Sequence, residues 1–201
     1  MTIRATTPGP GIVQLALADP QRRNPLSLAT LAALRSGLDE AIQHGARVVV
    51  LTADGPVFSA GADLDDLTGT AADEHYDDTV AALTTAITAA PIPVIAAIDG
   101  ACIGAAVDLA LSCDLVVVGC TAYLEIPAAR LGILYNPAAI ARLHRRVPAS
   151  ALRALLLGER LDAPACIHAG LALSAVEGAA AGRTSSGEGA ERPKPVHLQP
   201  A

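Results

Sequence analysis

The chain has 201 residues, a length that suits one domain. It is 52% hydrophobic but only 2% aromatic and has no tryptophan, so its core must be built from Ala, Val, Leu and Ile. A net charge of -6 without any basic tract argues against a nucleic-acid partner. No charge-free apolar run reaches the roughly 18 residues that a membrane span requires. The first residues lack the apolar core of a signal peptide, so we expect a cytoplasmic protein.

The first half of the chain alternates strand and helix signals. Apolar side chains recur with a helical rhythm after Ser27, a good N-terminal cap, whereas β-branched runs without alternation indicate buried strands. The expected elements are strand 11–18, helix 28–44, strand 47–52, a polar and mobile segment 68–78, helix 79–90 and strand 93–98.

The second half continues the same alternation, which is typical of a layered α/β fold. From about residue 178 the composition changes to Gly, Pro, Ser and charged residues, and we expect a disordered tail over 178–201. The expected elements before the tail are helix 107–113, strand 114–118, extended segment 123–127, a helical turn or loop at 128–134, and helices 137–145, 149–157 and 163–169.

Two turns made of glycine and small residues stand out, at 59–64 (SAGADL) and 99–106 (DGACIGAA). Each follows a buried strand and leads towards a helix. A helix start presents free N–H groups and the positive end of the helix dipole, which together favour a negative charge. Asp108 is the one acid in the apolar helix after the second turn, and it lies one turn inside that helix. These features predict a site that holds a developing anion.

Five segments follow one another along the chain: RRNPLS at 22–27, FSAGADL at 58–64, DGACIGAAVDLALSCDLVV at 99–117, LEIPAARLGI at 124–133 and GERLDAPACIHAGL at 158–171. In this order, they resemble the motifs of the enoyl-CoA hydratase/isomerase (crotonase) superfamily. The resemblance implies an α/β fold, a spiral of ββα units whose C-terminal helices are largely missing. It also implies an acyl-CoA-binding domain over residues 1–177.

The resemblance further assigns roles to residues. It makes the backbone N–H groups of Ala62 and Ala105 the two donors of an oxyanion hole, and Asp108 the catalytic acid or base. It places coenzyme A along the backbone of the first turn, with an arginine at its phosphates and a tyrosine near the acyl group. The substrate-binding residues implied are Arg22 (or Arg23), Ala60, Gly61, Asp63, Leu64, Gly104 and Tyr135.

Two departures from the family pattern bear on function. Family hydratases use two glutamates; the first matches Asp108, which is shorter by about 1 Å, and the second matches Ala128, which cannot move a proton. Glu125 is three residues early, and we expect its side chain to point elsewhere. One-base chemistry through Asp108 and a catalytically impaired acyl-CoA or acyl-chain binding protein both remain open.

The second departure is length, because family members usually continue with helices that close the acyl pocket and help to build a trimer. A homotrimer therefore stays an open expectation. No cofactor is expected beyond the coenzyme A of the substrate.

Several polar residues also have a structural interpretation. Asp63 suits the first turn of a helix, Asp114 a contact with backbone, Tyr135 packing, and the basic set Arg142, Arg145 and Arg146 a solvated face. The histidines show no metal-ligand spacing, so no metal site is expected. The four cysteines lack a C-x-x-C spacing and are expected to be reduced, buried side chains.

Overall fold

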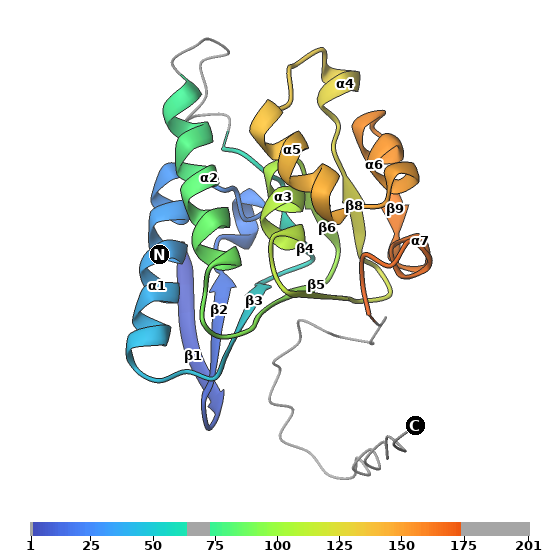
Figure 1. Cartoon of the computed structure of the whole chain (residues 1–201). Helices are drawn as coiled ribbons and strands as arrows, with labels where there is room; N and C mark the ends of the chain where they lie inside the picture. Colours follow the sequence, from blue (N-terminus) through green and yellow to red (C-terminus); the bar gives the residue numbers. More distant parts are fainter. Residues whose placement is uncertain (1, 64–72, 174–201) are drawn as a thin grey trace, which may run out of the picture.

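The computed structural model describes residues 2–63 and 73–173, which form two sheets with helices packed around them (Figure 1). The first sheet has the order β1-β2-β3-β5-β7. Its first pair is antiparallel and the others are parallel. The strands are β1 (Ile3–Gly9), β2 (Ile12–Leu17), β3 (Val48–Ala53), β5 (Val94–Ile98) and β7 (Leu115–Val118).

The second sheet has the order β4-β6-β8-β9, and its first three strands are parallel. The strands are β4 (Val57–Ser59), β6 (Ala101–Ile103), β8 (Tyr123–Glu125) and β9 (Leu161–Asp162). Along the chain, β3, β5 and β7 of the first sheet are each followed by a strand of the second, and then by a helix. This repetition is the predicted spiral of ββα units.

Three of the helices, α1, α5 and α7, begin at a residue whose side chain caps them. Ser27 accepts a hydrogen bond from the N–H of Thr30 at 3.1 Å, Asn136 caps α5, and Asp162 caps α7. The helices are α1 (Leu28–Gln43), α2 (Glu74–Thr88), α3 (Ala105–Leu111), α4 (Ala128–Leu131), α5 (Pro137–Arg146), α6 (Ala149–Leu156) and α7 (Ala163–His168), with a short 3₁₀ turn η1 (Pro20–Arg22).

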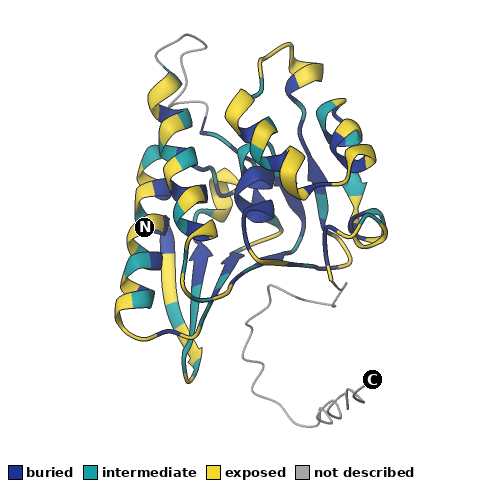
Figure 2. Ribbon diagram, viewed as in Figure 1, coloured by how far each residue is buried: buried dark blue, intermediate teal, exposed yellow. Residues whose placement is uncertain are grey.

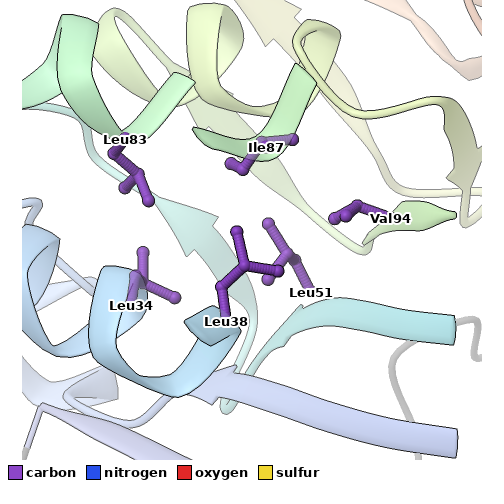
Figure 3. Close-up of a pocket in the computed structure, with 6 residues that line it drawn as sticks. All are labelled: Leu34, Leu38, Leu51, Leu83, Ile87 and Val94. Atoms are coloured by element: carbon purple, nitrogen blue, oxygen red, sulfur yellow. The ribbon is translucent and has the colours of Figure 1, made fainter. Parts of the chain in front are cut away.

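The hydrophobic core contains a cluster of aliphatic side chains between α1, α2 and the first sheet, and the buried helix α3. Leucines of α1 and α2 meet β3 and β5 with no space left for a water molecule (Figure 3); the side chains are Leu34, Leu38, Leu51, Leu83, Ile87 and Val94. Helix α3 is dark blue in Figure 2 because residues 106–111 are all buried. A buried helix places its one acid, Asp108, inside the protein.

Most predicted elements are confirmed within a few residues, but four expectations need correction. Strand β1 was not predicted, and β6 lies inside a segment interpreted as a turn. Helix α2 begins at Glu74 rather than residue 79, since its first-turn acids favour a helix start. Cys120 is exposed, unlike the other three cysteines.

Two predictions fall on residues 64–72 and 174–201, which lie outside the described part of the chain: the mobile segment, in its first half, and the disordered tail. Among the residues that are described, no helix is both long and apolar enough to cross a membrane.

Candidate active site

The two small-residue turns meet because the strands before them are neighbours. Strands β4 and β6 pair in parallel, with Ser59 opposite Cys102, so their carboxyl ends lie at one edge of the sheet. Gly61 in the first turn has φ +92°, and a Cβ added there would lie 2.7 Å from the carbonyl oxygen of Ile103 and 3.6 Å from the nitrogen of Ala105. The close contact between the turns therefore requires glycine.

Hydrogen bonds from the surrounding chain hold the first turn. The buried hydroxyl of Ser59 donates to the carbonyl of Asn24 at 2.7 Å and accepts from the N–H of Gly61 at 3.1 Å. The carbonyl of Gly61 in turn accepts from the N–H of Leu26 at 2.8 Å. Within residues 2–63 and 73–173, no partner is found for the N–H of Ala62. The turn is thus fixed while this one donor stays available.

The second turn opens directly into α3. Gly104 has φ +58°, and its N–H donates to the backbone carbonyl of Glu125 at 2.9 Å. The helix begins at the next residue, and the N–H of Ala105 likewise has no partner in the described part of the chain. Both predicted oxyanion donors, Ala62 and Ala105, therefore lie at the same edge of the second sheet, with N–H groups that no described residue binds.

Asp108 lies in α3, one turn from Ala105, and its side chain is only 1% exposed. Arg142 on α5 holds it with two hydrogen bonds, Nη2 to Oδ2 at 2.6 Å and Nε to Oδ1 at 3.3 Å. Burial raises the pKa of Asp108, and the guanidinium of Arg142 opposes that rise. The acid of the site is thus part of a buried ion pair.

Tyr135 joins the second turn to the segment before α5. Its hydroxyl donates to the carbonyl of Gly104 at 3.2 Å, and its ring packs against the core. Burial, together with the nearby charge of Asp108, raises its pKa, so the phenol is a neutral donor. Contact with the turn and core packing are both present; a role at the acyl group stays a prediction.

The remaining predicted substrate-binding residues lie in or beside the first turn. Arg22 forms an ion pair with the buried Asp63, with Nη1 3.1 Å from Oδ2 and Nη2 3.2 Å from Oδ1. The N–H of Ala60 donates to the carbonyl of Arg23 at 2.9 Å. Leu64 lies outside the described residues. Contact of this group with coenzyme A stays a prediction.

The position of the second family glutamate is apolar. Ala128 is buried at the start of α4. The nearby Glu125 is buried on β8, and its carboxylate accepts hydrogen bonds from Arg130 and, at 2.7 Å, from Arg160. The guanidinium of Arg160 also lies over the ring of Tyr123. The carboxylate of Glu125 therefore forms ion pairs with two arginines.

The solvated face predicted for the arginines of α5 is wrong for Arg142, whereas Arg145 and Arg146 are exposed. Arg142 is only 17% exposed, and Arg146 donates to the carbonyls of Ser112 and Cys113, at 2.7 and 3.0 Å, beyond the end of α3. A spacing of four residues places both on one face of the helix. A lone acid in an apolar helix was the signal for such a partner, because buried carboxylates need one.

Other polar positions agree with their structural interpretation or were missed. Asp114 accepts from the N–H of Val94 at 2.8 Å, as predicted. The buried side chain of Asn24 was not predicted: it accepts from the N–H of Asp19 and donates to the carbonyls of Asp54 and Val57. Among the described residues, no cluster of three His, Cys, Asp or Glu side chains could hold a metal ion.

The fold and the site together consist of repeated ββα units whose two glycine turns meet beside a buried acid. The sequence matches the model of the enoyl-CoA hydratase/isomerase family over residues 8–182, and the chain belongs to that family. The superfamily resemblance found in the motifs is thereby confirmed.

Individual relatives are similar over most of this chain. The probable enoyl-CoA hydratase echA6 of Mycobacterium tuberculosis is 36% identical over 167 residues, covering 83% of this chain and 68% of its own. The mitochondrial enoyl-CoA hydratase domain-containing protein 3 of Rattus norvegicus is 36% identical over 166 residues, but the match spans only 55% of that protein.

Solved structures share the fold. The crystal structure of human enoyl Coenzyme A hydratase domain-containing protein 3 superposes with a TM-score of 0.81 at 31% identity, covering 89% of this chain and 72% of its own. An enoyl-CoA hydratase from Bacillus anthracis also has a TM-score of 0.81, at 29% identity, with 88% and 70% covered.

Proposed function

We propose that the protein acts on an acyl-CoA thioester in fatty-acid or acyl-CoA metabolism, and that the thioester oxygen accepts hydrogen bonds from the N–H groups of Ala62 and Ala105. Two such donors stabilise the enolate that forms when a thioester loses an α-proton. The observation that supports this most is the contact of the two turns at Gly61, with both N–H groups free of partners among residues 2–63 and 73–173. No cofactor beyond the coenzyme A of the substrate is needed.

The titratable groups at the two family positions favour chemistry that uses a single base. Hydration needs two groups to hold and activate water, but Ala128 has no titratable group. Of the matched family positions, Asp108 is the one that can remove a proton at one carbon of the bound acyl group and return it at another. Double-bond migration or enolate protonation therefore fits the residues better than two-acid hydration.

The test is a turnover assay of the purified full chain on short and long enoyl-CoA thioesters, with products identified by mass spectrometry. We expect Asp108→Asn to lower turnover by about 10²- to 10⁴-fold, the usual contribution of a general base, while acyl-CoA still binds. The exposed Asp39, paired with Arg35 on α1, supplies the control Asp39→Asn, which should keep full turnover.

A second candidate function, acyl-CoA binding without turnover, is favoured by Ala128 and by the occupied carboxylate of Asp108. Calorimetry with a saturated acyl-CoA, and with coenzyme A alone, separates the two. Binding without product from any thioester would support this second function. Absence of binding would contradict both.

A further inference from the structure

The ion pair between Asp108 and Arg142 joins two elements that are far apart in sequence. The two residues are 34 positions apart, and α3 and α5 pack against each other. The guanidinium approaches side-on, through Nε and Nη2, so each carboxylate oxygen of Asp108 accepts one hydrogen bond. Such a two-point contact fixes both the position and the plane of the carboxylate.

The other titratable groups that the structure describes around this end of α3 add no charge. Tyr135, before α5, is a neutral donor to Gly104. Cys102 on β6 is a buried thiol whose pKa burial raises well above its ordinary value. Tyr76 on α2 donates its hydroxyl to the carbonyl of Leu26. Arg146 binds carbonyls beyond the opposite end of α3.

A buried carboxylate without a cation takes up a proton, because desolvation disfavours its charged form. A protonated Asp108 could not accept the α-proton of a thioester. We propose that Arg142 is a positioning residue for Asp108, which orients the carboxylate beside the start of α3 and keeps it an anion ready to accept a proton. This inference rests on the proposed function, in which Asp108 is the base.

The first test compares pH profiles of kcat/KM for the parent, Arg142→Gln and Arg142→Lys. Loss of a neighbouring cation raises a carboxyl pKa by about one to three units, so the acid limb for Arg142→Gln should move upward by at least about one pH unit. Arg142→Lys keeps the charge and should restore most of the shift. Arg145→Gln, at an exposed position on the same helix, should leave the profile unchanged.

A uniform loss of activity without movement of the acid limb would overturn the proposal, since a merely structural role predicts that result. If Arg142→Gln fails to show a cooperative thermal transition, the comparison of Arg142→Lys with the parent decides. In that comparison, a charge-based role requires an acid limb within about half a unit of the parent, because a lysine supplies the same charge. Loss of the limb or a shift as large as one unit contradicts it.

A second measurement does not depend on turnover. The side-chain carboxyl carbon of Asp108 can be titrated by ¹³C NMR and assigned from the spectrum of Asp108→Asn. Its pKa should rise by at least about one unit in Arg142→Gln even if the parent turns over no thioester. An unchanged titration would overturn the proposal, whereas a shifted titration in an inactive parent would contradict only the catalytic function.

Discussion

Two buried carboxylates lie on neighbouring ββα units and differ in what surrounds them. Glu125 on β8 is bound by Arg130 and Arg160, whose side chains are 55% and 62% exposed. Among the described residues, Asp108 on α3 has one cationic partner, Arg142, which is 17% exposed. One acid therefore meets two cations from the protein surface, and the other meets one cation inside the protein.

This difference separates a structural acid from a candidate base. The two arginines of Glu125 come from α4 and from the residue before β9, so the carboxylate ties those segments to β8. Asp108 ties α3 to α5, but it also lies one turn from the free N–H of Ala105. Burial raises the pKa of Asp108 and Arg142 opposes that rise, so this acid combines a desolvated carboxyl with a position beside the start of α3.

The largest effect on stability should come from the turn beside Asp108, not from either acid. Gly61→Ala places a Cβ 2.7 Å from the carbonyl oxygen of Ile103 at φ +92°, so both strain and a backbone clash result. We expect a loss of about 3 kcal/mol in the free energy of unfolding, together with weaker acyl-CoA binding. Urea denaturation measures the free energy of unfolding, and calorimetry measures the binding of acyl-CoA.

Gly45→Ala is the matched control for that substitution. Gly45 has φ +76°, but a Cβ there would meet nothing within 4 Å, so strain of about 1 kcal/mol alone is expected. Equal losses for the two variants would mean that the contact between the turns contributes little.

Glu125→Gln should test the structural side of the comparison. The amide cannot accept hydrogen bonds from two guanidinium groups as a carboxylate does, so we expect the free energy of unfolding to fall by roughly 2 kcal/mol. The loss should be smaller than for a fully buried ion pair because both arginines are largely exposed. The exposed pair of Arg35 and Asp39 is the reference: Asp39→Asn should cost at most about 0.5 kcal/mol. Chemical denaturation of both variants gives the numbers. Turnover lost by Glu125→Gln at full stability would instead assign chemistry to Glu125.

The pH dependence of stability should distinguish Asp108 further. Burial raises its pKa in the folded protein above the value in the unfolded chain, so the folded state holds the proton more tightly. Its contribution to stability is fully present below about pH 4, the unfolded pKa, and is lost as pH rises through the folded pKa.

The measurement is unfolding of the parent and of Asp108→Asn from pH 4 upward. The parent should lose stability relative to the variant, at no more than about 1.4 kcal/mol per pH unit, until the folded pKa is passed. A difference that is constant with pH, or that changes in the opposite direction, would show that the folded pKa is not raised.

Sequence patterns predicted the α/β class, the amphipathic helices and the two turns, because those depend on local periodicity and small residues. Strand β6 was missed because Ala101, Cys102 and Ile103 carry no strand pattern of their own; parallel pairing with β4 and β8 makes them a strand. Strand β1 is largely exposed and pairs only along one edge, so it lacks the apolar run of a buried strand.

The sequence indicated the two small-residue turns that the structure brings together, but it did not indicate the ion pairs beside them. Gly61 could be identified because it lies in a turn of small residues, and Asp108 because it is a charged residue in an otherwise apolar helix. The partner of Asp108 could not be identified, since Arg142 lies 34 residues away and three arginines of α5 are equivalent in sequence. Only the packing of α5 on α3 decides which arginine is buried.

The smallest predicted effect separates those neighbouring arginines. Arg146 donates to the carbonyls of Ser112 and Cys113 at the C-terminal end of α3, where a cation opposes the negative end of the helix dipole. Arg146→Gln should therefore lower the free energy of unfolding by about 1 kcal/mol. Arg145→Gln, at an exposed position, should change it by less than about 0.5 kcal/mol. Neither variant should alter the pH profile of kcat/KM, because the hydrogen bonds to the Asp108 carboxylate come from Arg142. A shift of the acid limb in Arg146→Gln would mean that the whole basic end of α5, rather than one arginine, sets the charge of Asp108.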